Sequence, residues 1–341
     1  MGATSLATTF ALAKQSAKGS GASTLFSLKL TDAMVFPSVT VEDTNDEFSG
    51  GTALISNSAG QRLGIHTRIS AAGRIRPDWF PQILIGAGLG DVTSTGTTPN
   101  YSHACTPSDD NDDYKWMTVY SDIDEGTANL ARIVEDVRLS RLRITANRNS
   151  VPRFEVEGMG IHEEIAAGTE TITAETGPVL TTVGGSITFN KSGGGAIAGN
   201  IRNCEIVIEN TFPSAEDSMV IGSTEMVDME WGGMAVTGTV DAAFSKAAFA
   251  EMFYAGASTA GTGYSLEDVE GTLTLVMESA ADIPTGAGPF TVTVAIPKLV
   301  ARAQEFRASG RNEVRLPIAF TAFKGTGELI TVTVLNDTAS Y

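Results

Sequence analysis

The chain has 341 residues, with 23 Lys and Arg against 40 Asp and Glu, a formal net charge of −17 at pH 7 and aromatic residues at 7%. Gripping DNA or RNA requires cationic side chains that face phosphates, so this balance argues against a conventional nucleic-acid-binding protein. It also argues against attraction to an anionic membrane surface. The length allows two ordinary domains, and the many Gly, Ser and Thr residues favour an all-β protein rich in turns.

The cysteines and the absence of long apolar runs indicate the cellular compartment in which the protein is made. Cys105 and Cys204 lie far apart with no metal-ligand spacing, so we expect two packed free thiols in a protein made in a reducing cytoplasm. No apolar run approaches the ~20 residues that a membrane helix needs, so no membrane insertion is expected. Residues 6–13 faintly resemble the apolar part of a signal peptide, but no basic segment precedes them.

The first half of the chain divides into an arm, a domain and a linker. Residues 1–24 have little apolar periodicity, which predicts an N-terminal arm that is loose alone and orders against a neighbour. A first β-sandwich domain is expected over residues 25–165, with a helix near residues 77–88. Pro77 and Asp78 suit the first turn of that helix. Residues 166–182 are Thr- and Gly-rich and indicate a linker.

A second β-sandwich domain is expected over residues 183–341. Its helix is predicted near residues 245–255, with Ser245 as the N-cap and Gly256 as the end. Residues 226–231 alternate apolar with acidic side chains and predict a strand. Residues 93–113, which belong to the first predicted domain, show no such alternation and are expected to form a loop.

A long hairpin over residues 137–161 suggests an internal duplication. The apolar phase of its first strand flips after Ser140–Arg141, which is how a β-bulge looks in sequence. Residues 148–156 parallel residues 311–318, with one residue inserted in the first copy. Each half therefore reads as strands, a short helix, then more strands and a long hairpin, which favours two related units. The alternative is that β-proteins simply look alike.

Signatures of catalysis or of cofactor binding do not occur. The chain has no Gly-x-Ser-x-Gly elbow, no His-Glu-x-x-His helix and no phosphate-binding loop with its Lys. The acidic run Asp109–Asp113 could collect a calcium ion, but it lacks the pattern of an EF-hand loop, so a solvated acidic loop is favoured. We expect a protein that is not an enzyme and that holds no cofactor or metal.

Several segments together resemble the tail tube proteins of long-tailed bacteriophages with non-contractile tails. The matching segments, which cover most of the chain, are Ala13–Thr24, Gly73–Ile75, the helix region Pro77–Gly90, His103 before Thr106–Pro107, the hairpin Val137–Ile161 and the ending Val314–Asn336. Each motif is degenerate, and the resemblance lies in their order and spacing.

The resemblance implies tandem β-sandwiches whose sheets join neighbours into a ring-shaped β-barrel. Rings would stack into a tube through which viral DNA passes, with tape measure and tail-tip proteins as further partners. The protein would be a virion component assembled in the host cytoplasm. Two tube domains per chain would let three chains build a pseudo-sixfold ring, and six chains are the alternative.

The resemblance also gives purposes to two sets of charged residues. An acidic strand face would line a channel that repels phosphate, and an ordinary solvent face is the alternative. The candidate lumen-facing residues are Glu155, Glu157, Glu205, Glu209, Asp228 and Glu230. The candidate contacts between rings are Lys14, Lys18, Glu42, Asp43, Asp46 and Glu47.

Rival functions come from two other classes. Within virion structure, the chain could be a hub, terminator or decoration protein of the tail or capsid. Outside it, a carbohydrate-binding β-sandwich module would need exposed aromatic platforms, whereas Trp79, Trp116 and Trp231 all lie in apolar patterns suited to a core.

Overall fold

A computed structural model describes residues 8–42, 61–90, 92–108, 110, 114–124, 129–166, 170–191, 195, 197, 200–254, 268–284, 286, 288–305 and 314–341. Over these residues the chain is mainly β with two short helices, as predicted, and its sheet does not close into a barrel. The strands of the N-terminal half are β1 (Thr8–Lys14), β2 (Thr24–Ser27), β3 (Leu30–Glu42), β4 (Gln61–Arg74), β5 (Thr93–Thr97), β6 (Asn100–Cys105), β7 (Met117–Asp124), β8 (Asn129–Asn147) and β9 (Arg153–Ile165). Those that follow are β10 (Thr171–Thr173), β11 (Leu180–Lys191), β12 (Ile201–Thr211), β13 (Gly233–Ala243), β14 (Val269–Asp282), β15 (Pro289–Ala303), β16 (Arg315–Ala322) and β17 (Thr331–Asn336). The helices are α1 (Phe80–Gly86) and α2 (Lys246–Tyr254).

One layer of the molecule is a run of antiparallel strands in the order β3, β4, β9, β8, β12, β13, β16 and β15, which we call the long sheet. Apolar side chains lie opposite one another across it. Ala71 pairs with Val156, Val156 with Leu142, Leu142 with Ile208, and Ile208 with Val236. Because all five are buried, this line crosses the centre of one face of the sheet and fixes its register.

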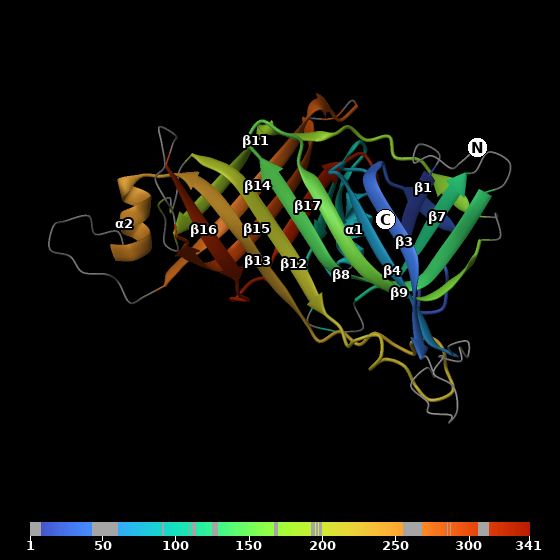
Figure 1. The fold of residues 1–341 in the computed structure, drawn as a ribbon. Coiled ribbons are helices and arrows are strands. Elements are labelled where there is room, and N and C mark those ends of the chain that lie inside the picture. Colours follow the sequence, from blue (N-terminus) through green and yellow to red (C-terminus); the bar gives the residue numbers. More distant parts are fainter. Residues whose placement is uncertain are drawn as a thin grey trace, which may run out of the picture.

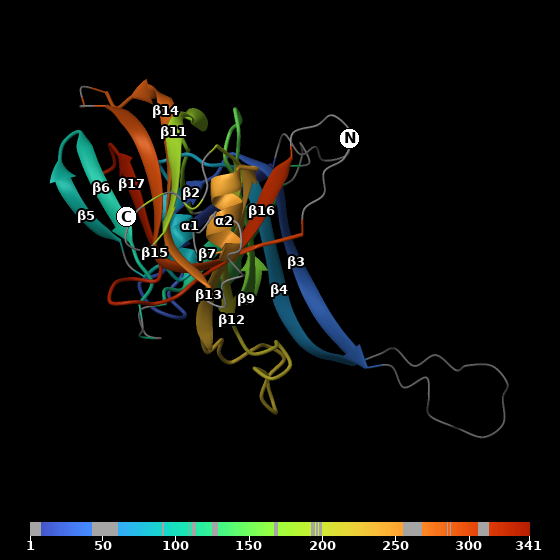
Figure 2. The ribbon, with the colours of Figure 1, turned by 90° about the vertical axis from the view of Figure 1, so that its left-hand side faces the viewer.

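The second layer contains strands that pair with the N-terminal parts of β8 and β15. β7 pairs with β8 as far as Val137, and β1 pairs with β7. β17 pairs with β15 from Thr291 to Ala295, and β6 pairs with β17. β8 changes partner from β7 to β12 close to a register shift between Leu139 and Arg141, where the sequence predicted a bulge. The two layers are visible in Figure 2, with β5, β6, β17 and β14 in one and β3, β4, β9 and β12 in the other.

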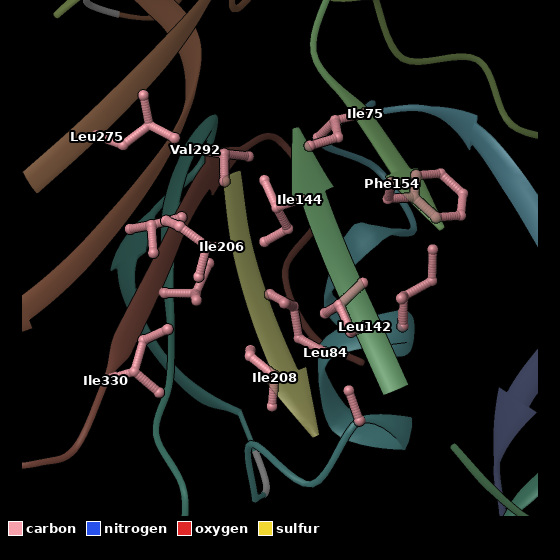
Figure 3. Packing of buried hydrophobic residues seen from close by; sticks show 14 of the residues in the cluster. Ile75, Leu84, Leu142, Ile144, Phe154, Ile206, Ile208, Leu275, Val292 and Ile330 are labelled. Carbon is pink, nitrogen blue, oxygen red and sulfur yellow. The ribbon is translucent and has the colours of Figure 1, made fainter. Parts of the chain in front are cut away.

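Helix α1 fills the space between the layers. Figure 3 shows Leu84 of α1 beside Leu142 of β8 and Ile208 of β12, and these residues belong to a single large core cluster. The helix starts at Phe80, three residues after Pro77, with Pro81 in its first turn. Pro77 and Asp78 were predicted to open it, but the Asp78 carboxylate instead accepts hydrogen bonds from the backbone and side chain of Thr176.

The segments predicted as arm and linker carry short strands. Thr8–Lys14 forms β1, and the side chains of Phe10 and Leu12 lie in the main core. The sequence pattern missed this strand because Ala11 and Ala13, on its other face, are also buried, so no polar alternation marks it. In the linker, Thr171–Thr173 pairs in parallel with β2. The division into arm, two domains and linker remains a prediction.

Two local predictions were wrong. Residues 93–113 were expected to be a loop, yet β5 and β6 form a hairpin there, because the Thr residues of β5 and Tyr101 of β6 favour a strand although no apolar alternation marks it. Residues 226–231 were expected to be a strand, but they lie in an irregular excursion between β12 and β13. Met226 and Met229 are buried there with a spacing of three, which no strand face provides.

Helix α2 lies at the opposite end of the ribbon from β1 and β7 (Figure 1), and Ser245 caps it through its Oγ and the backbone N of Ala248, as predicted. In the part of the chain that is described, no helix has the length and apolar character needed to cross a bilayer.

Candidate interaction surface

The outer face of the long sheet, opposite the core, carries a cluster of six charged side chains. Arg141 and Arg143 lie on β8, which is flanked by Glu155 and Glu157 on β9 and by Glu205 and Glu209 on β12. We call these six residues the charged face. They alternate with the buried Leu142, Phe154 and Ile206, and this alternation directs them away from the core.

Each arginine of the charged face is shared by two glutamates from different strands. The Arg143 guanidinium lies 3.2 Å from Glu155 Oε2 and 2.7 Å from Glu205 Oε2. Arg141 lies 3.8 Å from Glu157 Oε1 and 3.5 Å from Glu209 Oε1. The hydrogen bond with Glu205 raises the pKa of Arg143. The arginines therefore join β9, β8 and β12 across the middle of the sheet.

The charged face is not the purely acidic surface that its four glutamates suggested. Arg141 and Arg143 were not among the predicted site residues, although they alternate with the apolar Leu142 after the phase change in the hairpin and so could have been placed on the outer face. On the same face, neutral side chains flank the cluster, namely Ser70 and Ala72 on β4 and Thr237 and Thr239 on β13. The exposed Arg74 on β4 and Arg153 on β9 lie opposite each other on this face, next to Ala72 and Glu155.

Asp228 and Glu230 lie apart from the other four acidic candidates, in the excursion between β12 and β13. The Asp228 carboxylate lies 3.1 Å from Lys18 Nζ. The same ammonium group lies 5.1 Å from the centre of the Trp116 ring. The structure thus brings together Asp228, expected to face the lumen, and Lys18, expected to contact another ring.

The remaining candidate contacts between rings are only partly described. Lys14 ends β1, and its backbone N donates to Gln82 Oε1 at 3.0 Å. Glu42 is the last residue of β3. Asp43, Asp46 and Glu47 lie outside the described residues.

The first and last strands of the long sheet, β3 and β15, each have a backbone edge at which another strand could pair. Among the residues that the structure describes, β3 pairs with β4 alone. Phe36 on β3 is 62% exposed, and Met34 and Val41 are also exposed. We call this strand the β3 edge. A long, exposed apolar edge strand is a site of strand addition unless something covers it.

At the other end of the long sheet, β15 pairs with β16 through Ala303, while β14 reaches along its opposite side only as far as Ala301. We call residues 302–305 the β15 edge. The ladder with β14 ends at Ala301, and beyond it the Arg302 guanidinium donates two hydrogen bonds to the Asp268 carboxylate.

His103, one of the residues on which the family resemblance rests, has a structural role. It is fully buried on β6, where Nδ1 lies 2.8 Å from Ser94 Oγ and Nε2 lies 2.9 Å from Asn336 Oδ1. Burial lowers the pKa of His103. Nε2 also faces the Thr338 carbonyl oxygen, so the imidazole ties β6 to the C-terminal segment.

The three tryptophans do not form an aromatic platform. Trp79 stacks on Phe26 with ring centres 4.3 Å apart, and the Arg138 guanidinium lies 3.9 Å from the Trp116 ring centre. Trp231 packs beside Tyr114. In the described part of the chain, no group of three or more His, Cys, Asp and Glu side chains is arranged to hold a metal ion. Of the acidic run Asp109–Asp113, only Asp110 is described.

Comparison with protein families identifies a relationship. A family model described as phage tail tube protein matches residues 5–322. No curated protein matches the chain.

Proposed function

The chain belongs to the phage tail tube protein family, and on that premise we propose that it closes into rings of three copies, which stack into the channel for viral DNA. Membership of the family makes the chain a structural component of the virion that assembles with itself into a tube. The ring symmetry, the strand edges that join copies and the face that lines the channel are our proposals. So are the tape measure and tail-tip partners, a non-contractile tail and assembly in the host cytoplasm.

A repeated strand order supports two tube domains in one chain. In the N-terminal four strands of the long sheet, the hairpin β3–β4 is followed by β9 and then β8. In the next four, the hairpin β12–β13 is followed by β16 and then β15. Helices α1 and α2 each follow the second strand of their hairpin. The four-strand units stand in the same order and direction, as a duplication would leave them.

The pairing of β8 with β12, which we call the β8–β12 seam, is the observation that carries the proposal. It joins the two four-strand units into a continuous sheet from Asn203 opposite Asn147 to Glu209 opposite Arg141. A sheet that already continues from one unit to the next within the chain can continue in the same way to the next chain.

The register of the two units identifies the strands that would meet between chains. The parallel between residues 148–156 and 311–318 makes Val156 equivalent to Ile318. Their partners Ala71 and Val240 are then equivalent too, so β4 corresponds to β13 and β9 to β16. Residues 32–38 of β3 then occupy the place of residues 203–209 of β12. By the same correspondence, Arg302 occupies the place of Arg141. We therefore expect β3 of one copy to pair with the β15 edge of its neighbour.

The exposure of equivalent residues on β12 and β3 agrees with a strand of a neighbouring chain being absent beside β3. Val207 on β12, which lies between β8 and β13, is 7% exposed. Phe36, its counterpart on β3, is 62% exposed. A strand added at the β3 edge would remove the Phe36 side chain from water, a favourable change of about 25 cal/mol per Å² of apolar surface. It would also satisfy the outward backbone groups.

Substituting Phe36 tests the ring contact. Phe36→Glu places a carboxylate where the neighbouring chain would cover it, whereas in the free chain the position is open to water. We expect this variant to remain a folded monomer by light scattering, with an unchanged melting temperature. Val183→Glu is the matched control because Val183 is 73% exposed on β11, away from both edges. It should assemble like the unmodified protein.

Electron microscopy reads the outcome of this comparison. Hollow tubes from the unmodified chain and from Val183→Glu, with none from Phe36→Glu, support the proposed contact. Tubes from Phe36→Glu as abundant as those of the control would refute it.

A further inference from the structure

We propose that an apolar groove around Phe323 is the binding site of a second copy of the chain, which fills it with the residues that join β3 to β4 (residues 43–60). This inference rests on the proposed function, in which β3 of one copy lies beside the β15 edge of its neighbour. It adds a second contact to that interface. The chain already makes an equivalent contact internally, between its own two four-strand units.

Within one chain, the second unit reaches over part of the first. Residues 212–232, which join β12 to β13 and which we call the excursion, lie below β4 and β9 in Figure 1, where they are yellow. The ladder between β4 and β9 ends at Thr67. Beyond it, the backbone N of Ile65 on β4 donates to the Thr224 carbonyl oxygen at 2.7 Å, and Ile65 forms a parallel bridge with Glu225. The excursion thus gives β4 a backbone partner where β9 no longer pairs.

The excursion also covers an apolar side chain of the first unit. Ile161 on β9 is only 7% exposed, and it packs with Met226 and Met229 of the excursion in a cluster separate from the main core. Met219 packs against the same cluster. Methionines from the next unit along the long sheet therefore help to remove Ile161 from water.

The equivalent side chain of the second unit is exposed. Continuing the equivalence of Val156 with Ile318 along the chain makes Phe323 the counterpart of Ile161. Phe323 is 46% exposed. A large aromatic side chain that is half open to water is a common anchor of protein interfaces.

A groove lies beside Phe323. Its volume is about 300 Å³, and Trp231, Met234 and Leu329 line it together with Phe323. Met234 on β13 is the counterpart of Ile65 on β4, the residue that pairs with the excursion in the first unit. The groove therefore occupies, in the second unit, the place that the excursion fills in the first.

The register of the two hairpins identifies the segment that would fill the groove. Thr40 lies opposite Gly64 in β3–β4, and Thr211 lies opposite Gly233 at the equivalent place in β12–β13. The excursion follows directly in the second unit, and residues 43–60 follow after a short extension of the ladder in the first. By the duplication, residues 43–60 are the counterpart of the excursion.

The composition and position of residues 43–60 suit this contact. They include the large apolar residues Phe48, Leu54 and Ile55. Figure 2 shows the adjoining ends of β3 and β4 projecting beyond the other strands, so the segment begins and ends away from the body of its own chain.

Both proposed contacts involve the same neighbour. The excursion covers the unit that precedes its own in the long sheet. In a ring, the unit that precedes the first unit of a chain is the second unit of the neighbour whose β15 edge meets β3. Residues 43–60 would therefore reach the Phe323 groove of that neighbour, within the ring.

Substitution separates cover from within the chain from cover by a neighbour. Phe323→Ser should raise the concentration at which tubes form by at least about tenfold, because assembly no longer buries the aromatic ring. Ile161→Ser, at the equivalent position, should lower the melting temperature of the unassembled chain far more than Phe323→Ser does. Val183→Ser, at an exposed position on β11, is the control and should change neither quantity.

Disulfide trapping identifies the occupant of the groove. Three variants carry Phe323→Cys together with Phe48→Cys, Leu54→Cys or Ile55→Cys, and each is oxidised after assembly and separated on a non-reducing gel. We expect at least one variant to give covalent products that stop at three chains, because a contact within a ring of three closes on itself. Placing the cysteine at Val183 instead of Phe323 should leave single chains.

The outcomes distinguish this inference from the proposed function. Tubes without any covalent product would overturn the inference and leave the proposed function standing. Products that lengthen without limit would also overturn it, because they would place residues 43–60 against another ring. Unmodified protein that stays monomeric at every concentration would count against both proposals.

Discussion

Arg143 on β8 and Glu205 on β12 form a 2.7 Å ion pair although 62 residues of chain separate them. The pair crosses the β8–β12 seam, where two four-strand units become one sheet. Beneath it, Ile144 and Ile206 lie directly opposite each other and are fully buried. The seam therefore has an ionic outer side and an apolar inner side, and both can be tested.

The apolar side should dominate the stability of the seam. Ile206→Ala removes a fully buried side chain from the main core and leaves a cavity. We expect a loss of about 2–5 kcal/mol in the free energy of unfolding, measured by chemical denaturation. Val183→Ala, at an exposed position, should change it by less than about 0.5 kcal/mol. A loss at Ile206 no greater than that at Val183 would mean that the seam contributes little.

Gly238 on β13 should not tolerate a side chain. An added methyl group would collide with the Glu205 carbonyl oxygen and with the Phe320 ring, and the carbonyl belongs to a paired strand. Gly238→Ala is expected to cost about 1–3 kcal/mol, because the β12–β13 ladder must shift. Gly327→Ala, where nothing lies within 4 Å, is the control and should be nearly neutral. Equal melting temperatures for the two variants would contradict the close approach.

Glu175 should make the stability of the chain depend on pH. Burial raises the pKa of this carboxyl from 4.5 to about 7, partly offset by the backbone N of Lys29 and by Arg76. Because the folded state holds the proton more tightly than the unfolded chain, the resulting stabilisation is present below pH 4.5 and is lost as pH rises through about 7. The shift corresponds to roughly 3 kcal/mol.

Glu175→Gln tests that linkage, since its neutral amide does not titrate. The variant should be more stable than the unmodified protein at pH 8, and the difference should shrink toward pH 5. Denaturation midpoints at the two pH values measure this. A difference that grows as pH falls would have the wrong sign and would show that Glu175 is ionised in the folded chain.

The cysteines should be unreactive until the chain unfolds. Cys105 and Cys204 are buried free thiols, as their spacing predicted. Burial and the neighbouring Glu205 raise the pKa of Cys204 to about 12, so little thiolate is present near neutral pH. We expect a thiol reagent to label neither cysteine in the native protein and both in denaturant. Rapid native labelling of Cys204 would indicate that the seam opens readily.

Local patterns in the sequence predicted much of the fold. The phase change at Ser140–Arg141 predicted the bulge in β8, and alternation predicted the apolar faces of β9 and β12. Both helices were placed near their observed positions. These features depend on neighbours only a few residues away, so their pattern is written in the local sequence.

Features that depend on distant partners were not predictable in this way. The acidic alternation of Glu155 and Glu205 was visible, but their sharing of Arg143 depends on which strands flank β8. Asp78 was expected to start a helix, whereas it holds residues 176 and 177 of the linker region. In both cases the partner of the charged side chain lies far away in the chain, and only the folded arrangement brings the two together.

The claim that three chains close a ring through the β3 edge can be tested by a cryo-EM reconstruction of the assembled protein, because it resolves which strands meet between chains. We predict hollow tubes with three chains per ring, with both four-strand units of every chain in the wall of the channel. β3 of each chain should lie beside residues 302–305 of its neighbour. Rings of six chains with a single four-strand unit of each in the barrel would contradict the claim, as would tubes in which the β3 edge stays free.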